Sequence, residues 1–596
     1  MRRVAFSVVT AAAVLTVSST VALASRPAAA AEAGYRTQSL HFAVVVGPAG
    51  SQRQCDIVGD LYTPASASAQ QPAPAILTTN GFGGSAASQT PFAQQYAAQG
   101  YVVLSYSGLG FGGSGCKITL DDPDYDGLAA SQLVSFLGGA PGIAFTDAGH
   151  TDPVPALDYV LRDAVDHRGN AGQHDPRVGM WGGSYGGQVQ FAVASIDARV
   201  DVLNPQITWN DLSYSLGPNN GATLGAETNG APQVGTPGAA KMTWSSTFSA
   251  IGVFNGAQYA QQDPQRVIGC PNFADFVCPA LVNAGATGYL RPGDIARLRH
   301  ASVASYLPRI TIPVLLVQGE VDTLFNLNES IATYQALRRQ HTPVSLLWRY
   351  NGHSGGTPSA AGAAYEASRT QAWFDHYLKG AGVSTGPGFA YYQDWSGTMA
   401  TAAGYPVGKA RRLYLSGDDL VSSGVRPGSQ SFSTPAAGAP STLGNLDVVG
   451  AEVDVPLDNP DLNLPGTFAS WTGAPLTAPV TVVGTPTLDV QLSAPTAALS
   501  QASGPGGQLV LFAKLYDVDQ AGTASLINGL VAPARIADVS RSVRITLPGI
   551  AHRFAAGHRI ALCLAGGDTN YRGGQLATPV TVRTGSSSQV LTLPIV

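Results

Sequence analysis

The sequence predicts two folded parts, a mainly parallel β-sheet with helices on both faces and, after it, an all-β sandwich. In the first part, short apolar runs such as 75–77, 101–104 and 178–181 alternate with helical patterns. This alternation is typical of parallel strands joined by helices. After Gly380, runs of alternating apolar residues are separated by turn residues, a pattern that favours antiparallel strands in a sandwich.

The N-terminus has the pattern of a secretory signal peptide, which we expect to span residues 1–31. Arg2 and Arg3 precede an uncharged stretch, and small-residue cleavage sites lie at 22–24 and 29–31. The stretch is rich in Ala, Ser and Thr and poor in Leu, which argues against a membrane anchor. Because no later stretch has about 18 consecutive apolar residues, we expect a secreted protein with no membrane span once the signal is removed.

The order of patterns along the chain predicts how the two parts are divided. Residues 36–204 and 309–400 carry the strand–helix alternation of the α/β core, with one crossover helix expected at 156–165. Residues 205–308 interrupt it with Asn, Gly, Gln and aromatic residues between two predicted sheet strands, so we expect an inserted cap. Residues 410–596 form the predicted β-sandwich.

Composition and charge exclude some functions. The chain has 33 Lys and Arg against 38 Asp and Glu, a formal net charge of −5. Such a chain does not build a large basic groove, so we expect no nucleic-acid partner. No Cys or His spacing is typical of a zinc site, and we expect neither a metal nor a cofactor. The sequence does not indicate an oligomeric state.

The five cysteines fit an exported protein, in which disulfides persist. Cys270 and Cys278 are close in sequence and are the pair we expect first, while Cys55 and Cys116 form a second possible pair. Cys563 lies in an apolar strand-like run, where we expect a buried thiol.

A nucleophile motif follows one of the predicted strands. Residues 182–186 read Gly-Gly-Ser-Tyr-Gly, a G-x-S-x-G sequence between the strand 178–181 and the apolar segment 189–194. A tight strand-to-helix turn of this kind holds a serine side chain at the carboxyl edge of a sheet. Ser184 is therefore the candidate nucleophile.

A serine nucleophile needs a base and an orienting acid, which follow it in this order in such folds. Asp322 lies just beyond the predicted strand 313–319, and His353 lies in a glycine-rich loop after the strand 345–348. We expect Ser184, Asp322 and His353 to form a catalytic triad. Glu320 is the alternative acid, in the same loop.

Other histidines have simpler interpretations. His376 lies within a helical pattern, where packing or surface exposure accounts for it, and we expect His552 and His558 of the β-rich part to be structural.

The oxyanion of the reaction requires two hydrogen-bond donors. The backbone N–H of Tyr185, directly after the nucleophile, is the first candidate, and that of Phe82, in the glycine-rich loop after strand 75–77, is the second. A further glycine loop at 107–114 lacks the lysine and the spacing of a phosphate loop, and we interpret it as scaffold.

Together these motifs resemble the X-prolyl dipeptidyl-peptidase and cocaine-esterase family of serine hydrolases. The resemblance covers nearly all of the mature chain and implies an α/β-hydrolase core, a helical cap and a C-terminal jelly-roll sandwich, with the triad named above. One departure is Phe82, since many members have a tyrosine in this loop. The segments that carry the resemblance are 182–187, 319–322, 352–353, 373–380, 515–519, 551–554 and 557–559.

The resemblance implies a small peptide or ester substrate. We expect an X-prolyl dipeptidyl-peptidase that releases N-terminal dipeptides, with a cocaine-esterase-type carboxylesterase as the alternative and a carbohydrate- or cell-wall-binding protein with an inactive core as a minor one. A dipeptidyl-peptidase needs a carboxylate to anchor the free amine of its substrate. The candidates in the cap are Asp211, Glu227, Asp263, Asp275 and Asp294.

One acidic cluster outside these motifs resembles the start of a calcium loop. Asp122, Asp124 and Asp126 have the right spacing, but Leu133 occupies the twelfth position, where such a loop needs Glu. We interpret the cluster as helix-capping or surface residues.

Overall fold

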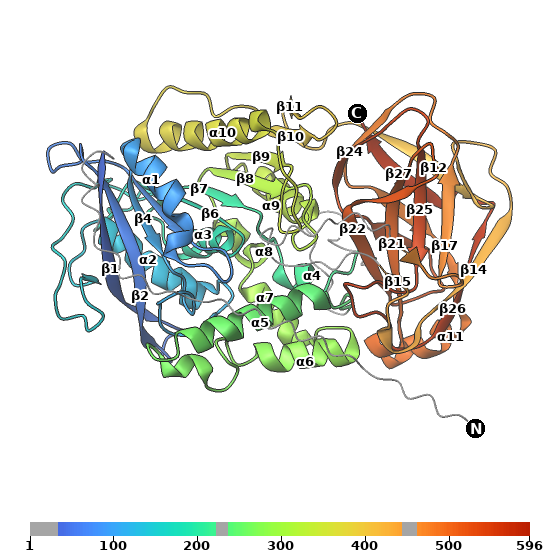
Figure 1. Ribbon diagram of the computed structural model, residues 1–596, viewed down its shortest axis with the longest axis horizontal. Coiled ribbons are helices and arrows are strands. Elements are labelled where there is room, and N and C mark those ends of the chain that lie inside the picture. Colours follow the sequence, from blue (N-terminus) through green and yellow to red (C-terminus); the bar gives the residue numbers. More distant parts are fainter. Residues whose placement is uncertain (1–33, 222–235, 444–461) are drawn as a thin grey trace.

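A computed structural model describes residues 34–221, 236–443 and 462–596 (Figure 1). The α/β part and the β-rich part lie side by side, and helices α5 and α6 run along one edge of the molecule. The predicted signal peptide, residues 1–31, lies outside the described residues. In the described part, no helix is long and apolar enough to cross a membrane.

The α/β part is built on one eleven-stranded sheet in the order β11-β10-β9-β8-β7-β6-β3-β4-β2-β1-β5. The strands from β4 to β10 along this order pair in parallel, and those at the two edges pair antiparallel. The parallel strands are β3 (Ala75–Thr79), β4 (Val102–Tyr106), β6 (Val178–Gly183), β7 (Val200–Gln206), β8 (Val314–Gly319), β9 (Val344–Arg349) and β10 (Phe389–Gln393). The edge strands are β1 (Tyr35–Val46), β2 (Arg53–Pro64), β5 (Ala144–Phe145) and β11 (Thr398–Ala402).

Helices cover both faces of this sheet. α1 (Thr90–Ala98) and α10 (Ala360–Lys379) pack on one face, and α2 (Leu128–Leu137), α3 (Tyr185–Ile196) and α9 (Leu327–Arg339) pack on the other. Alternate strand residues face opposite sides, so Leu77 packs with the second group and Ile76 with the first. The predicted mainly parallel sheet between two helical layers is confirmed.

The crossover helix predicted at 156–165 was wrong. This segment is irregular and makes only isolated bridges, such as Ala73 with Val160. Leu157 and Val160 are buried as the apolar pattern required, but the sheet edge and neighbouring loops bury them without a helix. The helix before β6 is α2, earlier in the chain.

The chain between β7 and β8 forms helices that lie over the carboxyl edge of the sheet (Figure 1). These helices are α4 (Leu212–Leu216), α5 (Met242–Gln258), α6 (Val277–Thr287), α7 (Pro292–His300) and α8 (Val303–Tyr306). Apolar side chains of α4, α5, α6 and α7 pack with Phe111, Tyr185 and Phe325 of the α/β part in a core of their own, while those of α8 join the core of the sheet. We refer to them as the cap.

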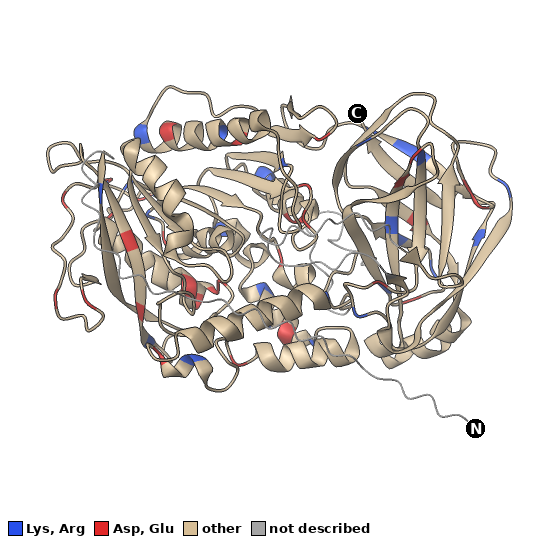
Figure 2. Cartoon of the chain, viewed as in Figure 1, with Lys and Arg blue, Asp and Glu red and all other residues tan. Residues whose placement is uncertain are grey.

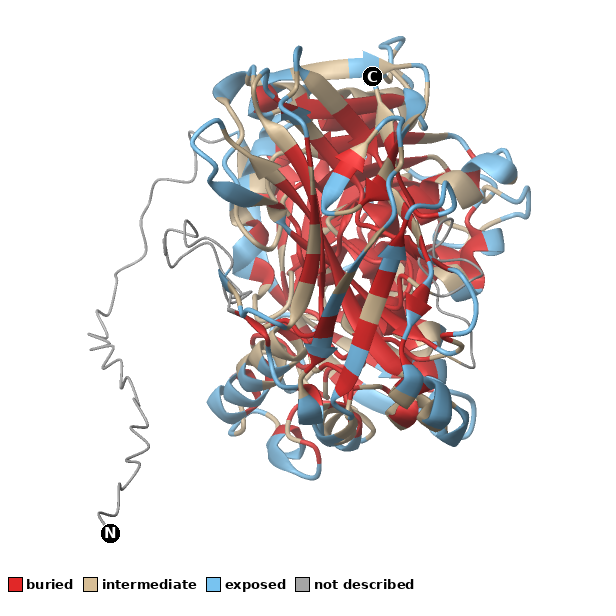
Figure 3. Cartoon of the chain, turned by 90° about the vertical axis from the view of Figure 1, so that its right-hand side faces the viewer, coloured by how far each residue is buried: buried red, intermediate tan, exposed pale blue. Residues whose placement is uncertain are grey.

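The β-rich part begins at β12 (Lys409–Ser416) and is a sandwich, as predicted. Its strands bury one apolar core, while turns at its edge are exposed (Figure 3). The large sheet comprises β12, β13 (Asp419–Val421), β17 (Phe468–Gly473), β18 (Val480–Gly484), β19 (Thr487–Val490), β21 (Leu509–Val518), β22 (Ala524–Ile536), β23 (Val543–Thr546), β24 (Ile550–Phe554), β25 (Arg559–Ala565) and β27 (Val590–Ile595). Smaller sheets comprise β14 (Gly428–Thr434), β20 (Leu492–Ser493) and β26 (Thr578–Thr584), and β15 (Thr442–Leu443) with β16 (Leu462–Asn463). The short helix α11 (Pro495–Ser500) packs against β26.

Two disulfides join the cysteine pairs that the sequence suggested. Cys55 is bonded to Cys116, and Cys270 to Cys278. Cys563 is buried in β25, as predicted. Acidic and basic residues are scattered through both parts of the molecule (Figure 2).

Candidate active site

Ser184 sits in a strained turn between β6 and α3. Its φ of 57° and ψ of −119° are unfavourable for a residue with a side chain, a strain typical of functional positions. Glycines make the turn possible. A Cβ on Gly186 would lie 2.5 Å from the carbonyl oxygen of Thr79, and one on Gly182 would lie 2.6 Å from the Gly186 oxygen. The first and last glycines of the motif, Gly182 and Gly186, thus each have a steric reason.

His353 connects Ser184 with Asp322. Its Nε2 lies 2.8 Å from Ser184 Oγ, and its Nδ1 lies 2.8 Å from Asp322 Oδ2. The other carboxylate oxygen of Asp322 accepts hydrogen bonds from the backbone N–H groups of Leu324 and Phe325, at 3.0 and 2.8 Å. Asp322 is fully buried and His353 mostly so. The structure therefore brings together the three residues of the predicted triad.

The alternative acid points elsewhere. The Glu320 carboxyl accepts a hydrogen bond at 3.0 Å from the backbone N–H of Tyr392, a residue of β10. It does not reach His353, whose Nδ1 bonds to Asp322. Burial raises the pKa of the Glu320 carboxyl well above its usual range, which favours its neutral form.

The remaining histidines lie outside the site. His376 bonds to the carbonyl of Val383 at the end of α10, and His552 and His558 both bond to Asp517 in the sandwich.

Two aromatic rings pack against the imidazole of His353. Trp244 of α5 and Phe325 both meet it edge-on, with ring centroids 5.9 and 5.1 Å from that of the imidazole. Trp244 is fully buried. These contacts restrict the orientation of the imidazole, and no local sequence pattern beyond the aromatic-rich cap predicted them.

Both candidate oxyanion donors flank Ser184. Tyr185 is the first residue of α3, where a helix leaves its N–H without an intrahelical partner. Phe82 lies in the turn closed by the 3.1 Å bond from Gly84 N to Gly81 O. A Cβ on Gly81 would lie 3.7 Å from Ser184 Cβ, so this turn passes directly beside the nucleophile.

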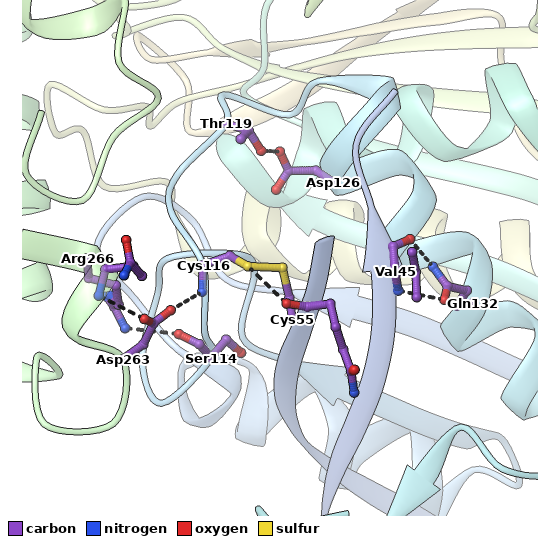
Figure 4. The surroundings of a disulfide bond; sticks show 11 residues. Val45, Cys55, Ser114, Cys116, Thr119, Asp126, Gln132, Asp263 and Arg266 are labelled. Carbon is purple, nitrogen blue, oxygen red and sulfur yellow. Dashed lines mark hydrogen bonds between the residues drawn. A yellow bond between two sulfur atoms is a disulfide. The ribbon is translucent and has the colours of Figure 1, made fainter. Parts of the chain in front are cut away.

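The buried carboxyl group of Asp126 anchors the Tyr185 side chain. The Tyr185 hydroxyl accepts a hydrogen bond from the backbone N–H of Asp121 at 3.1 Å and donates one to Asp126 Oδ1 at 3.3 Å. Asp126 also accepts a hydrogen bond from Thr119 (Figure 4). Burial raises the pKa of Asp126 to about 7.

The glycine loop at 107–114 is scaffold, as interpreted from the sequence. Arg266, a buried cap residue, donates to the carbonyl oxygens of Gly110, Gly112 and Ser114. Asp263 accepts the N–H of Cys116 at 2.7 Å, beside the disulfide to Cys55 (Figure 4). The carbonyl oxygens of this loop are thus tied to the cap, which fits a structural role.

A cavity of about 110 Å³ opens beside Ser184 under the cap. Among the described residues its lining has no charged side chain. The lining residues are Phe82, Leu120, Ser184, Tyr185, Trp209, Leu212, Leu216, Ser245, Phe248, Ser249, Phe273, Phe276, Val277, Ala280, Leu281, Ala284, Leu290, Leu298 and Phe325. It is comparable to a cavity that takes one aromatic ring or a short branched chain.

The four described carboxylates among the candidate amine anchors do not line this cavity. Asp211 caps α4 and pairs with Arg299, and Asp294 pairs with Arg291. Asp263 caps a short helical turn, and Asp275 is largely exposed beside Lys117. Glu227 lies outside the described residues.

The acidic cluster has structural roles. Asp122 caps the turn that starts at Pro123 by accepting the N–H of Asp124 at 2.8 Å. Asp124 pairs with His300 at 3.1 Å. The capping interpretation is thus confirmed for Asp122, while Asp126 turns inward to Tyr185.

Comparisons with known proteins agree with this geometry, and together they define a serine hydrolase with an α/β-hydrolase core. Residues 55–355 match the model of the X-Pro dipeptidyl-peptidase (S15 family), and residues 382–591 match that of the X-Pro dipeptidyl-peptidase C-terminal non-catalytic domain. The chain belongs to the X-Pro dipeptidyl-peptidase S15 family.

Solved structures share the whole fold at low sequence identity. An aminopeptidase from a marine sediment Thaumarchaeota archaeon is 12% identical with a TM-score of 0.63, covering 97% of this chain and 98% of its own. An α-amino acid ester hydrolase is 15% identical with a TM-score of 0.61, covering 98% and 100%. A CocE/NonD family hydrolase from Staphylococcus aureus is 13% identical with a TM-score of 0.58, covering 94% and 97%. The search of curated proteins gave no match.

Proposed function

We propose that the protein hydrolyses ester or amide bonds through an acyl-enzyme on Ser184. The Ser184 oxygen attacks the substrate carbonyl while His353 Nε2 takes its proton, and Asp322 orients the imidazole through Nδ1. His353 then returns the proton to the leaving group. A water molecule, activated by the same histidine, releases the acid and frees Ser184.

The observation that carries this proposal is the pair of 2.8 Å contacts that His353 makes with Ser184 and Asp322. The three side chains come from loops that follow β6, β8 and β9, and in the sheet only β7 lies between these strands. The backbone N–H groups of Tyr185 and Phe82 are the proposed oxyanion donors. A binding protein with an inactive core would have no reason to keep this arrangement.

The lining of the cavity favours an uncharged acyl group, and therefore carboxylesterase activity. Burying an unpaired ammonium in an apolar site costs several kcal/mol. None of the described cap carboxylates is available to pair with it. The family match favours a second candidate, an X-prolyl dipeptidyl-peptidase, whose substrates carry a free N-terminal amine. Both disulfides support secretion as part of the proposal.

One assay separates the two candidates. The purified protein is given aryl esters of apolar acids, Ala-Pro and Gly-Pro anilides, and the same anilides with a blocked amine. We expect the protein to hydrolyse the aryl esters, and to hydrolyse the blocked anilides faster than those with a free amine. Cleavage of free-amine X-prolyl substrates but not of blocked ones would select the dipeptidyl-peptidase. No turnover of any substrate, with Ser184 unreactive toward an organophosphate, would contradict both.

A further inference from the structure

The cap contacts the acid loop, residues 320–325, directly. Lys241, at the start of α5, is buried and its Nζ donates to the backbone oxygens of Thr323 and Leu324, at 2.6 and 2.9 Å. These two residues follow Asp322 in the chain, and the Leu324 N–H bonds to the Asp322 carboxylate. Lys241 therefore holds the peptide units that hold Asp322.

A second contact comes from the next turn of the same helix. Trp244 lies three positions after Lys241, on the same face of α5, and its Nε1 donates to Thr323 Oγ1 at 3.1 Å. The same indole packs edge-on against His353. One cap residue thus touches both the acid loop and the imidazole.

Thr323 joins the acid loop to the loop that carries His353. Its N–H donates to Ser354 Oγ at 3.0 Å, and the two hydroxyl oxygens lie 2.6 Å apart. Ser354 is the neighbour of His353 in the chain. The loops of the acid and the base are therefore linked to each other at Thr323, and linked to the cap at the same residue.

We propose that Lys241 and Trp244 are positioning residues, which set the Asp322–His353 geometry through Thr323. The inference rests on the proposed function, because it assigns these two residues to the triad of that mechanism. Neither residue is among those that line the cavity beside Ser184. Their effect is on the alignment of the base, and a small misalignment of a catalytic group lowers the rate without weakening substrate binding.

The first test compares two lysines that both bond to backbone carbonyls. Lys241→Met removes the contact with the acid loop. Lys117→Met is the matched control, since Lys117 Nζ donates to the oxygens of Ile268 and Cys270, away from the site. We expect kcat of folded Lys241→Met to fall about tenfold or more with KM nearly unchanged, and Lys117→Met to keep both constants.

A spectroscopic reading separates positioning from stability. The downfield proton of the Asp322–His353 hydrogen bond should shift or broaden in Lys241→Met and stay in place in Lys117→Met. Equal kcat and an unchanged proton signal in folded Lys241→Met would overturn the proposal, even if its melting temperature falls.

A double-mutant cycle tests the second contact without removing a buried charge. Trp244→Phe keeps a ring against His353 but loses the indole N–H, and Thr323→Val loses the accepting hydroxyl. We expect Thr323→Val, which also loses the hydroxyl contact with Ser354, to lower kcat at least as much as Trp244→Phe, and the double variant to fall no further than Thr323→Val. If the two single-variant losses in kcat multiply in the double variant, the proposed coupling is wrong.

Failure of this inference is distinguishable from failure of the proposed function. Labelling of wild-type Ser184 by an organophosphate tests the mechanism alone. If Ser184 is labelled and required for turnover while Lys241 and Trp244 are dispensable, only the positioning roles are wrong.

Discussion

His353 Nε2 lies 2.8 Å from Ser184 Oγ, although the two residues are 169 positions apart in the chain. Ser184 is fixed by the tight turn after β6, and His353 by the loop after β9. Because parallel strands end at the same edge of the sheet, these turns converge there. Proton transfer from the serine to the imidazole therefore needs no rearrangement.

Ser184→Ala should abolish hydrolysis and leave the fold intact. The hydroxyl is the proposed nucleophile, while an alanine Cβ occupies the same space in the turn. We expect kcat to fall by about 10⁴-fold or more, with an unchanged circular dichroism spectrum. Mass spectrometry should find organophosphate on Ser184 of the wild type. Undiminished turnover by the variant, or label on another residue, would remove Ser184 from the mechanism.

Asp322→Asn should cost about 10⁴-fold in kcat, because an amide cannot orient the imidazole in the required tautomer. Glu320→Gln is the matched control. Burial raises the pKa of the Glu320 carboxyl, which favours its neutral form, and the carboxyl accepts the Tyr392 N–H, an interaction that the amide oxygen can keep. Steady-state kinetics of both purified variants check this, and a large loss in Glu320→Gln with none in Asp322→Asn would reverse the assignment.

The fold and the site were predictable to different depths. G-x-S-x-G, Asp322 and His353 could be found because each follows a strand, and strand ends have strong local signals. The helix at 156–165 was wrong because its apolar spacing fits either a helix or an irregular segment packed on a sheet edge. Trp244 and Lys241 act across long sequence separations, through contacts that no local pattern encodes.

Ala284→Leu should narrow the acyl specificity. Ala284 is buried in α6 and lines the cavity of about 110 Å³, so three added carbons fill part of it. We expect kcat/KM for esters of aromatic acids to fall about tenfold or more, and that for acetyl esters to change little. Ala286→Leu, on the exposed face of the same helix, should leave both unchanged. An equal loss for both ester classes would place the acyl group elsewhere.

Loss of the two disulfides should have unequal costs. Cys55–Cys116 closes a loop with a sequence separation of 61 residues, and Cys270–Cys278 one of 8. Loop-closure entropy gives about 4 and about 2.5 kcal/mol respectively. Each disulfide is removed by replacing both of its cysteines with serine, and denaturant unfolding measures the free energy of unfolding. The loss should be larger for Cys55→Ser combined with Cys116→Ser. The opposite order would mean that the cap depends on the Cys270–Cys278 bond for more than chain entropy.

Asp126→Asn should become more stable than the wild type as pH rises. Burial raises the pKa of Asp126 from about 4 to about 7 in the folded protein. The folded state therefore holds a proton that the unfolded state releases, and wild-type stability falls between these pH values. An amide does not ionise, and its partners are the hydroxyls of Thr119 and Tyr185, which can donate or accept. The free energy of unfolding of the variant relative to wild type should rise by up to about 4 kcal/mol from pH 4 to pH 7, and level off above.

The control for this pH effect is Asp166→Asn, whose stability relative to wild type should change with pH in the opposite direction. Backbone N–H groups, first that of Asn170, lower the pKa of Asp166, which is exposed. Ionised Asp166 therefore stabilises the fold above its unfolded pKa, and Asp166→Asn should lose stability relative to wild type as pH rises through about 4. Chemical denaturation at about pH 2.5, 3 and 4 measures the trend for Asp166→Asn, whose change lies below its unfolded pKa. The same measurement at about pH 4, 5.5, 7 and 8 follows Asp126→Asn. A flat difference for Asp126→Asn would mean that Asp126 is ionised in the folded protein throughout this range, and that Tyr185 is held by a carboxylate.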